Sequence, residues 1–348
     1  MTGHCNALWA AALCVASLAG AGTAAAAAAQ TGARQGTVTV ERIKVHGRAL
    51  EGNLEGNDPD REIWVALPPS YARESNRRYP VVYVLHGYNW SPDKWFASDQ
   101  LDQRIANAYA AGAREMILVF PNADTLHGGS MYSRSVTTGD WEAFITRDLV
   151  RQIDAKYRTI PRRESRGLMG HSMGGYGTAR LGMKYPDVFS SMYVMSACCL
   201  PARTITPEQG RAVEEVRTKE QAASGNFLVR ATLAVASSWS PNPGKPPFFV
   251  DLPTEKGELV PRVLAEWAAN SPLAMLPQHV PDLRRYKAIA IDVGNRDGLM
   301  DDNAALHAAM GRFGIRNSFE VYDGDHGSGV ATRFEQKVLP FFSNNLQF

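Results

Sequence analysis

The chain has 348 residues and a formal net charge of +2, with 45% hydrophobic and 21% charged residues. This length allows one or two domains with a large core, and the composition is typical of a soluble globular protein. The 37 basic and 35 acidic residues nearly balance. Because nucleic acids bind surfaces with a clear basic excess, we expect no nucleic-acid partner.

Residues 1–30 differ in composition from the rest of the chain. An apolar run from Ala7 to Gly22 is followed by six alanines that end at Ala29. An apolar segment before small residues is typical of a secretory signal peptide, so we expect a secreted or periplasmic protein without a stable membrane anchor. The usual basic start is missing, since no Lys or Arg precedes Arg34. A transmembrane anchor and a disordered alanine-rich tail are the alternatives, although the run is short for a membrane span.

Removal of this segment would leave residues 31–348 as the mature domain, with only two cysteines, Cys198 and Cys199. Adjacent cysteines bridge only through a strained ring. We therefore expect two buried thiols at the end of a strand and no stabilising disulfide.

The remaining chain reads as strands that alternate with helices. Two segments with alternating polar and apolar residues, 37–45 and 61–67, predict an antiparallel edge. Further strands are expected at 79–85, 116–121, 165–169, 191–196, 286–293 and 318–322, and helices at 101–111, 141–157, 302–313 and 331–342. Such alternation predicts a parallel sheet with helices on both faces.

Residues 201–284 interrupt this alternation. They contain a charged helical segment at 207–223, a loop rich in Pro and Gly at 240–247, and several aromatic residues. We expect this stretch to be a cap insertion over the functional site rather than a separate domain.

The stretch Gly170-His171-Ser172-Met173-Gly174 lies between the expected strand at 165–169 and a further expected helix, which ends at Tyr185-Pro186. A direct turn from strand to helix holds the middle serine on a strained corner with its hydroxyl exposed. The positions two residues before and after the serine, Gly170 and Gly174, must be small, because a Cβ there would collide with neighbouring backbone. Ser172 is therefore a candidate nucleophile, although the pentapeptide alone also fits a glycine-rich turn.

A serine nucleophile needs a base and an orienting carboxylate. In this kind of sheet the acid and then the histidine follow the serine, each in a loop after a strand. Asp297 and His326 occupy these two places, so we predict a Ser172–Asp297–His326 triad. Three other acidic residues lie near the same turn, inside the strand or at the start of the next helix: Asp292, Asp301 and Asp302.

Two backbone N–H groups would have to bind the oxyanion. The residue after the nucleophile, Met173, is expected to give one, and the loop after the first central strand the other. That loop reads Leu85-His86-Gly87-Tyr88, which is also a common tight turn. In combination with the triad, it makes the Tyr88 N–H the expected second donor.

These motifs together resemble the putative-esterase family of α/β hydrolases, which includes feruloyl esterases, S-formylglutathione hydrolase (esterase D) and mycolyltransferases. The resemblance covers about residues 79–342. It rests on Val84-Leu85-His86-Gly87, Gly139 to Ile145, Gly170 to Gly175, the Asp297 turn and Gly324-Asp325-His326-Gly327. It implies an α/β-hydrolase fold: a mostly parallel central sheet with antiparallel N-terminal edge strands and a cap insertion.

The resemblance also implies a serine carboxylic-ester hydrolase that needs no metal or cofactor and forms an acyl-enzyme on Ser172. Its substrate would be a small-molecule ester with a feruloyl, aryl or short acyl group. An acyltransferase that uses an alcohol or sugar acceptor, and a non-catalytic binding module, are the alternatives. Three cap aromatics, Trp239, Phe248 and Trp267, would suit an aromatic or acyl group, although aromatic residues in an insertion more often form its own small core.

Overall fold

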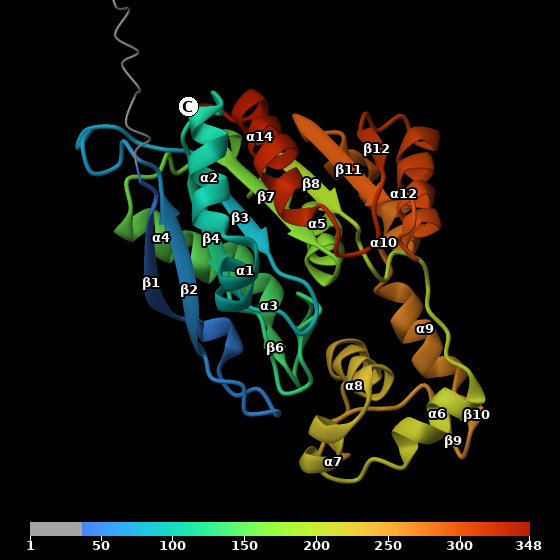
Figure 1. Ribbon diagram of the computed structural model, residues 1–348. Coiled ribbons are helices and arrows are strands. Elements are labelled where there is room, and N and C mark those ends of the chain that lie inside the picture. Colours follow the sequence, from blue (N-terminus) through green and yellow to red (C-terminus); the bar gives the residue numbers. More distant parts are fainter. Residues whose placement is uncertain (1–36) are drawn as a thin grey trace, which may run out of the picture. The chain divides into compact units, whose positions relative to one another are not determined.

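The computed structural model describes residues 37–348, and the expected signal peptide at 1–30 lies outside the described residues. An eight-stranded sheet runs through this part of the chain (Figure 1), in the order β1-β2-β4-β3-β7-β8-β11-β12. Its strands are β1 (Thr39–His46), β2 (Asp60–Leu67), β3 (Val81–Leu85), β4 (Ile117–Pro121), β7 (Arg166–His171), β8 (Ser191–Met195), β11 (Ala288–Gly294) and β12 (Ser318–Tyr322).

The strand directions confirm the fold expected from the sequence. β1 is antiparallel to β2, and β2 is antiparallel to β4. All other neighbours in this sheet are parallel. The carboxyl ends of β3, β7, β8, β11 and β12 therefore lie at one edge, which is where ligands bind in open α/β sheets.

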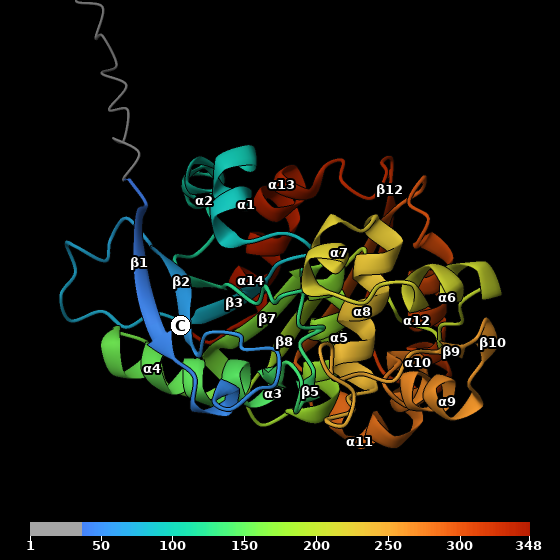
Figure 2. The same ribbon diagram turned by 90° about the horizontal axis from the view of Figure 1, so that it is seen from below.

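Helices cover both faces of the sheet (Figure 2). One apolar cluster joins Val82 and Val84 to α1 (Pro92–Asp99), α2 (Leu101–Ala110), α13 (Val330–Arg333) and α14 (Leu339–Asn345). Clusters on the opposite face include α3 (Trp141–Ala143), α4 (Val150–Lys156), α5 (Met173–Lys184) and α12 (Met300–Arg312). A π-helical stretch, Phe144–Leu149, links α3 to α4. Between residues 37 and 348, no helix is both long and apolar enough to cross a membrane.

The part of the insertion between β8 and β11 that runs from α6 (Pro207–Glu214) to α9 (Pro261–Ala269) lies beyond the carboxyl ends of the strands (Figure 1). The whole insertion contains α6, α7 (Lys219–Ser224), α8 (Phe227–Trp239), α9, α10 (Pro272–Met275), α11 (Val280–Leu283) and a small hairpin, β9 (Thr254–Glu255) and β10 (Glu258–Leu259). A second hairpin, β5 (Arg134–Ser135) and β6 (Gly139–Asp140), packs against α8. Helices α10 and α11 pack on α5. We therefore use "cap" only for residues 201–270 of the expected 201–284.

Two details of the cap differ from the sequence expectation. The helical segment expected at 207–223 is two helices, because Thr218 and Gln221 form a capping box that begins α7. The 13-residue helix α8 was not expected at all. Its residues are largely apolar on every side because it is buried between the cap and the sheet domain, so they lack a clear helical stripe.

The junction between β7 and α5 requires glycine at two positions. A Cβ on Gly170 would lie 2.3 Å from the carbonyl carbon of Gly174, and a Cβ on Gly174 would lie 1.9 Å from the Leu85 carbonyl oxygen. Both distances are far below any allowed contact, as expected for this turn. The residue between them, Ser172, has φ 59° and ψ −115°.

Gly174→Ala tests this constraint. Because backbone and not a flexible side chain blocks the new methyl group, we expect a loss of at least about 1–3 kcal/mol of unfolding free energy. Urea denaturation followed by circular dichroism would measure it.

Gly311→Ala is the matched control, since Gly311 lies in α12 and its Cβ would meet nothing within 4 Å. There we expect a gain of roughly 0.5–1 kcal/mol from the higher helix propensity of alanine. Equal effects at both positions would contradict this account of the junction.

Candidate active site

Ser172 is held by backbone contacts to the next strand. Its N–H donates to the Met195 carbonyl (3.0 Å), and its carbonyl accepts from the N–H groups of Tyr176 (3.0 Å) and Cys198 (3.1 Å). The corner between β7 and α5 is thus tied to the end of β8. This fixes the serine side chain at the carboxyl edge of the sheet.

The structure brings the three predicted triad residues into one hydrogen-bonded chain. The His326 Nδ1–H donates to Asp297 Oδ2 at 2.9 Å, since a carboxylate can only accept. His326 Nε2 is then the acceptor for the Ser172 hydroxyl, also at 2.9 Å. The Asp297 side chain is 1% exposed and that of His326 43%, so the base reaches solvent while its orienting carboxylate does not.

Two loops at neighbouring strand ends position the acid and the base. The Arg296 N–H donates to the Gly324 carbonyl at 2.9 Å, and the Gly324 N–H donates to Asn295 Oδ1 at 3.1 Å. Asp297 Oδ1 accepts the Leu299 N–H, which leaves Oδ2 for the histidine. These short contacts couple the loop after β11 to the loop after β12.

Asp292, an alternative acid in the sequence, has a different place. Its Oδ2 accepts from Arg333 Nε at 2.6 Å and from the Tyr193 hydroxyl at 2.7 Å. Burial raises the pKa of this carboxyl, and the Arg333 guanidinium opposes that shift. Asp292 therefore ties β11 to β8 and α13, while Asp297 is the acid that contacts His326. Asp301 and Asp302 lie in the first turn of α12.

His171, the variable residue of the pentapeptide, contacts the predicted base directly. Its Nε2–H donates to the His326 carbonyl oxygen at 2.8 Å, and the two ring centroids are 4.8 Å apart. Desolvation and the neighbouring His326 lower the pKa of His171 to about 4, so its imidazole is neutral near pH 7. His171 thus positions the base without adding a charge, which the sequence motif alone did not indicate.

The two predicted oxyanion donors lie next to Ser172. Tyr88 and Met173 line one cavity together with the serine, and within residues 37–348 neither backbone N–H donates to a protein acceptor. The loop that carries Tyr88 is fixed by buried His86, whose Nε2 accepts the Ala123 N–H at 2.8 Å. Burial lowers the pKa of His86 to about 4, which keeps that nitrogen an acceptor.

Two cavities meet at Ser172. The loop cavity, of about 390 Å³, is lined by Gly87, Asn89, Trp90, Trp95, His171, Gly327 and Val330 among others. The thiol cavity, of about 300 Å³, is lined by Met131, Cys198, Cys199, Arg203, Ile205, Leu228, Val235 and Trp267 among others. Tyr88, Ser172, Phe227 and His326 line both.

Phe227, the first residue of α8, is the cap side chain shared by the two cavities. It is 68% exposed although it is a large apolar residue, and its ring meets that of Tyr88 edge-on at 5.5 Å. An apolar side chain exposed inside a cleft is typical of a ligand contact. Phe227 was not predicted as a site residue because α8 was not expected, although Asn226 is a recognisable N-cap.

Of the three cap aromatics expected to bind substrate, only Trp267 lines a cavity at Ser172. Trp239 is 5% exposed, and its indole N–H donates to Ser133 Oγ at 3.1 Å. It packs on Tyr176 and Trp267, so it belongs to the core between the cap and α5. The partner of this indole N–H lies about a hundred residues away in sequence, so the burial of Trp239 could not be predicted from local sequence.

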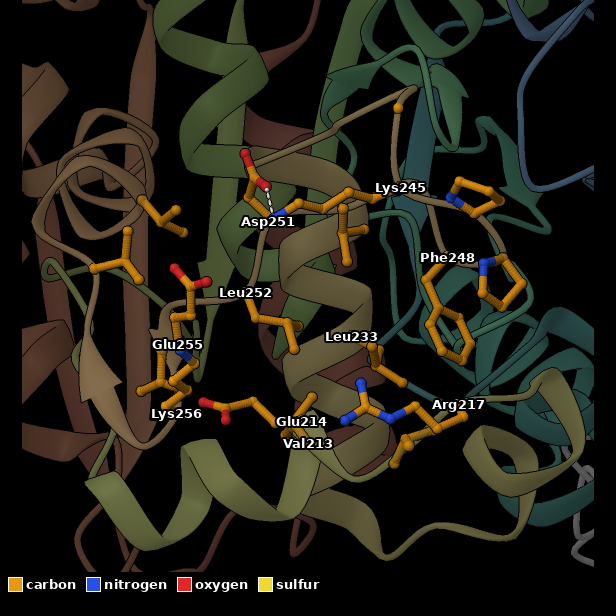
Figure 3. Close-up of a pocket in the computed structure, with 18 of the residues that line it drawn as sticks. Val213, Glu214, Arg217, Leu233, Lys245, Phe248, Asp251, Leu252, Glu255 and Lys256 are labelled. Atoms are coloured by element: carbon orange, nitrogen blue, oxygen red, sulfur yellow. Dashed lines mark ion pairs between the residues drawn. The ribbon is translucent and has the colours of Figure 1, made fainter.

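Phe248 lines a third, distal cavity of about 540 Å³ within the cap, which no triad residue reaches (Figure 3). There Asp251 pairs with Lys245 at 2.7 Å and with Arg262 at 2.6 Å. These contacts outweigh the effect of burial and lower the pKa of Asp251 to about 2. The distal cavity is thus a charged surface hollow and Phe248 is part of its apolar floor.

Among residues 37–348, no three His, Cys, Asp or Glu side chains gather as a metal site would require. The chemistry that the described residues can perform is nucleophilic: a serine hydroxyl, a base with an orienting carboxylate, and two unpaired N–H groups beside them.

Comparison with known proteins identifies a family and several relatives. Residues 57–328 match the model of the family described as "Putative esterase". "Esterase Rv1288" of Mycobacterium tuberculosis is 34% identical over 131 residues, which are 36% of this chain and 27% of that protein. The chain therefore matches only about a quarter of the length of this curated relative.

Solved structures extend the likeness to most of the chain. A ferulic acid esterase superposes with a TM-score of 0.63 at 25% identity, over 89% of this chain and 99% of that one. S-formylglutathione hydrolase (FrmB) of Staphylococcus aureus has a TM-score of 0.58 at 15% identity, over 89% and 99%. The family model covers most of the described residues and includes Ser172, Asp297 and His326, and this chain belongs to the putative-esterase family of α/β hydrolases.

Proposed function

We propose that this protein is a serine carboxylic-ester hydrolase that forms an acyl-enzyme on Ser172. The observation that carries the proposal is the chain of 2.9 Å contacts from Ser172 through His326 to buried Asp297. A serine held on a strained corner next to an oriented imidazole is the arrangement that acyl transfer needs.

In the first step, the Ser172 oxygen attacks the ester carbonyl carbon while His326 Nε2 takes its proton. Buried Asp297 stabilises the imidazolium that forms and holds its tautomer. The tetrahedral oxyanion is bound by the Tyr88 N–H, from the loop after β3, and by the Met173 N–H at the N-terminus of α5, where the helix dipole also favours negative charge.

The tetrahedral intermediate then collapses: its bond to the alcohol oxygen breaks, His326 gives its proton to that oxygen, and the acyl-enzyme remains. In the second half, a water oxygen attacks the acyl carbonyl carbon while His326 takes one of its protons. The bond to the Ser172 oxygen then breaks, His326 returns the proton to that oxygen, and the acid is released. His171 supports both halves by holding the backbone carbonyl of His326.

We propose a small ester with an aryl, feruloyl or short acyl group as the substrate. The cavities of about 390 and 300 Å³ lie at the lower end of the roughly 300–1,000 Å³ usual for ligand pockets. This space suits one compact group on each side of Ser172 better than a long lipid chain. The similarity to a ferulic acid esterase supports the aryl choice.

Acyl transfer to an alcohol or sugar is the second candidate. It is favoured by the presence of two cavities that meet at Ser172, because the loop cavity could hold an acceptor while the acyl group stays in the other. Added acceptor alcohols distinguish the two functions: a transferase diverts most of the acyl group to a new ester, whereas a hydrolase releases the free acid.

We also propose that the protein is exported, on the basis of the apolar and alanine-rich residues 7–29. Expression of the full chain, cell fractionation and N-terminal sequencing test this. A processed chain that begins near residues 24–31 in the secreted or periplasmic fraction is expected, and an unprocessed cytosolic chain would contradict it.

Replacement of the triad residues should abolish ester hydrolysis. For Ser172→Ala, His326→Gln and Asp297→Asn we expect kcat losses of roughly 10⁴-fold or more, because the nucleophile, the base or its tautomer is lost. A panel of acetyl, butyryl, long-chain acyl and feruloyl esters would measure these losses and rank the acyl groups.

His307→Gln and Asp301→Asn are the matched controls, since both residues lie in α12 and line neither cavity at Ser172. We expect both to retain near-normal kcat. If Ser172→Ala were as active as the unchanged protein on every ester, the proposed mechanism would be wrong.

Phe227 should set the preference between acyl groups. In Phe227→Ala the shared wall of the two cavities is lost, so the ratio of kcat/KM for feruloyl over acetyl esters should change by roughly tenfold or more, the usual effect of a pocket contact. Leu259→Ala is the control, because Leu259 is a similarly exposed cap residue that lines neither cavity. An unchanged ratio in Phe227→Ala would exclude a role for this side chain in selectivity.

A further inference from the structure

The proposed mechanism leaves two reactive side chains at the site unused. Cys198 and Cys199 are free cysteines with their Sγ atoms 2.9 Å apart. Both line the thiol cavity together with Ser172 and Met173. Small molecules that reach the serine through this cavity therefore also reach the thiols.

The backbone of this pair is hydrogen-bonded to the backbone of Ser172. The Cys198 N–H donates to the Ser172 carbonyl at 3.1 Å. Cys199 has φ 59°, in the left-handed region that non-glycine residues rarely occupy. A change in the geometry of this dipeptide would act on the corner that holds Ser172.

The surroundings of the pair favour a thiolate at one sulfur. The hydrogen bond between the two thiols and the nearby Arg203 guanidinium lower the pKa of Cys199, while the same thiol contact raises the pKa of Cys198. Thiolates, not thiols, react with peroxides and disulfides. The pair thus combines a nucleophilic sulfur with a second sulfur placed to resolve an oxidised intermediate.

We propose that Cys198 and Cys199 form a redox modification site, at which hydrogen peroxide converts the dithiol to a reversible disulfide that reshapes the thiol cavity and lowers ester turnover. The effect on turnover rests on the proposed hydrolase function, whereas the oxidation itself does not.

Oxidation of the thiol pair by one peroxide takes two steps. The Cys199 thiolate attacks one peroxide oxygen, the O–O bond breaks, and the departing hydroxide takes a proton to form water. The Cys198 sulfur then attacks the Cys199 sulfenic acid, so that an S–S bond forms and the S–O bond breaks. The hydroxide that leaves takes the Cys198 proton, and the pair has lost two electrons to one peroxide.

The expected bridge is strained and hence reversible. A trans peptide fixes neighbouring Cα atoms about 3.8 Å apart, below the usual range of roughly 4.4–6.8 Å for disulfide-linked residues. Strained disulfides are easily reduced and serve as labile, regulatory bonds rather than structural ones. This agrees with the absence of a stabilising disulfide expected from the sequence.

Peptide mass mapping of the full chain tests the modification directly. After reduction and mild hydrogen peroxide treatment, the tryptic peptide that contains both cysteines should lose two hydrogens and regain them with dithiothreitol. Oxidation of Met192 or Met195 in the same peptide adds oxygen and is distinguished by mass. Cys198→Ser and Cys199→Ser should not show the loss, and Arg203→Gln should show it more slowly near neutral pH.

Ester turnover provides the second measurement. In the unchanged chain, kcat/KM should fall roughly tenfold on oxidation, as for other changes of a pocket wall, and recover with dithiothreitol. In Cys199→Ser the ratio of treated to untreated activity should stay near one.

The two measurements separate the possible failures. If the peptide never loses two hydrogens, the redox site is overturned. If it does so without any change in turnover, the proposed effect on the cavity is overturned. If no form of the protein hydrolyses any ester, the proposed function fails, and the mass measurement still decides the thiol chemistry.

Discussion

The close approach of α5 to β3 is the constraint on which the rest of the site depends. Gly174 lies against the Leu85 carbonyl with no space for a Cβ, and this contact forces the chain to turn at Ser172 with a positive φ. The same turn places the serine N–H on the Met195 carbonyl at the end of β8. The carboxyl ends of three neighbouring strands are thereby fixed relative to the nucleophile before any side chain of the triad is considered.

This constraint explains why the catalytic candidates could be predicted from the sequence. Glycines at fixed offsets from Ser172 report a local backbone requirement, and Asp297 and His326 follow recognisable strands by only a few residues. Their proximity could be predicted without any information on distant packing, because parallel strands bring their carboxyl ends to the same edge of the sheet. The sheet, including its antiparallel edge, was also predictable, because the pattern of polar and apolar residues within each strand reflects which of its faces are buried.

The cap was predicted less well, because its side chains are placed by contacts between distant segments. Trp239 is an aromatic residue in an insertion near the site, yet its indole N–H is satisfied by Ser133 and its ring is buried against Tyr176. Phe227 lies at the opposite end of the same helix and faces the cavities instead. From the sequence alone, Trp239 and Phe227 are equally good candidates for a substrate contact. Only the position of α8 shows that one is buried and the other lines the cavities.

The structure thus divides two tasks between two parts of the chain. In the proposed mechanism, bond making and breaking depend on the sheet edge, where His326, Asp297 and the N–H donors are held by short contacts between strand ends. The shape of the substrate space depends on the cap, which contributes Phe227 to both cavities. Cys198 and Cys199 lie where these parts join, since the Cys198 N–H donates to the Ser172 carbonyl and both cysteines line a cavity that cap residues also line. A chemical change at this junction can therefore alter substrate space and nucleophile geometry together, which a change confined to the cap cannot do.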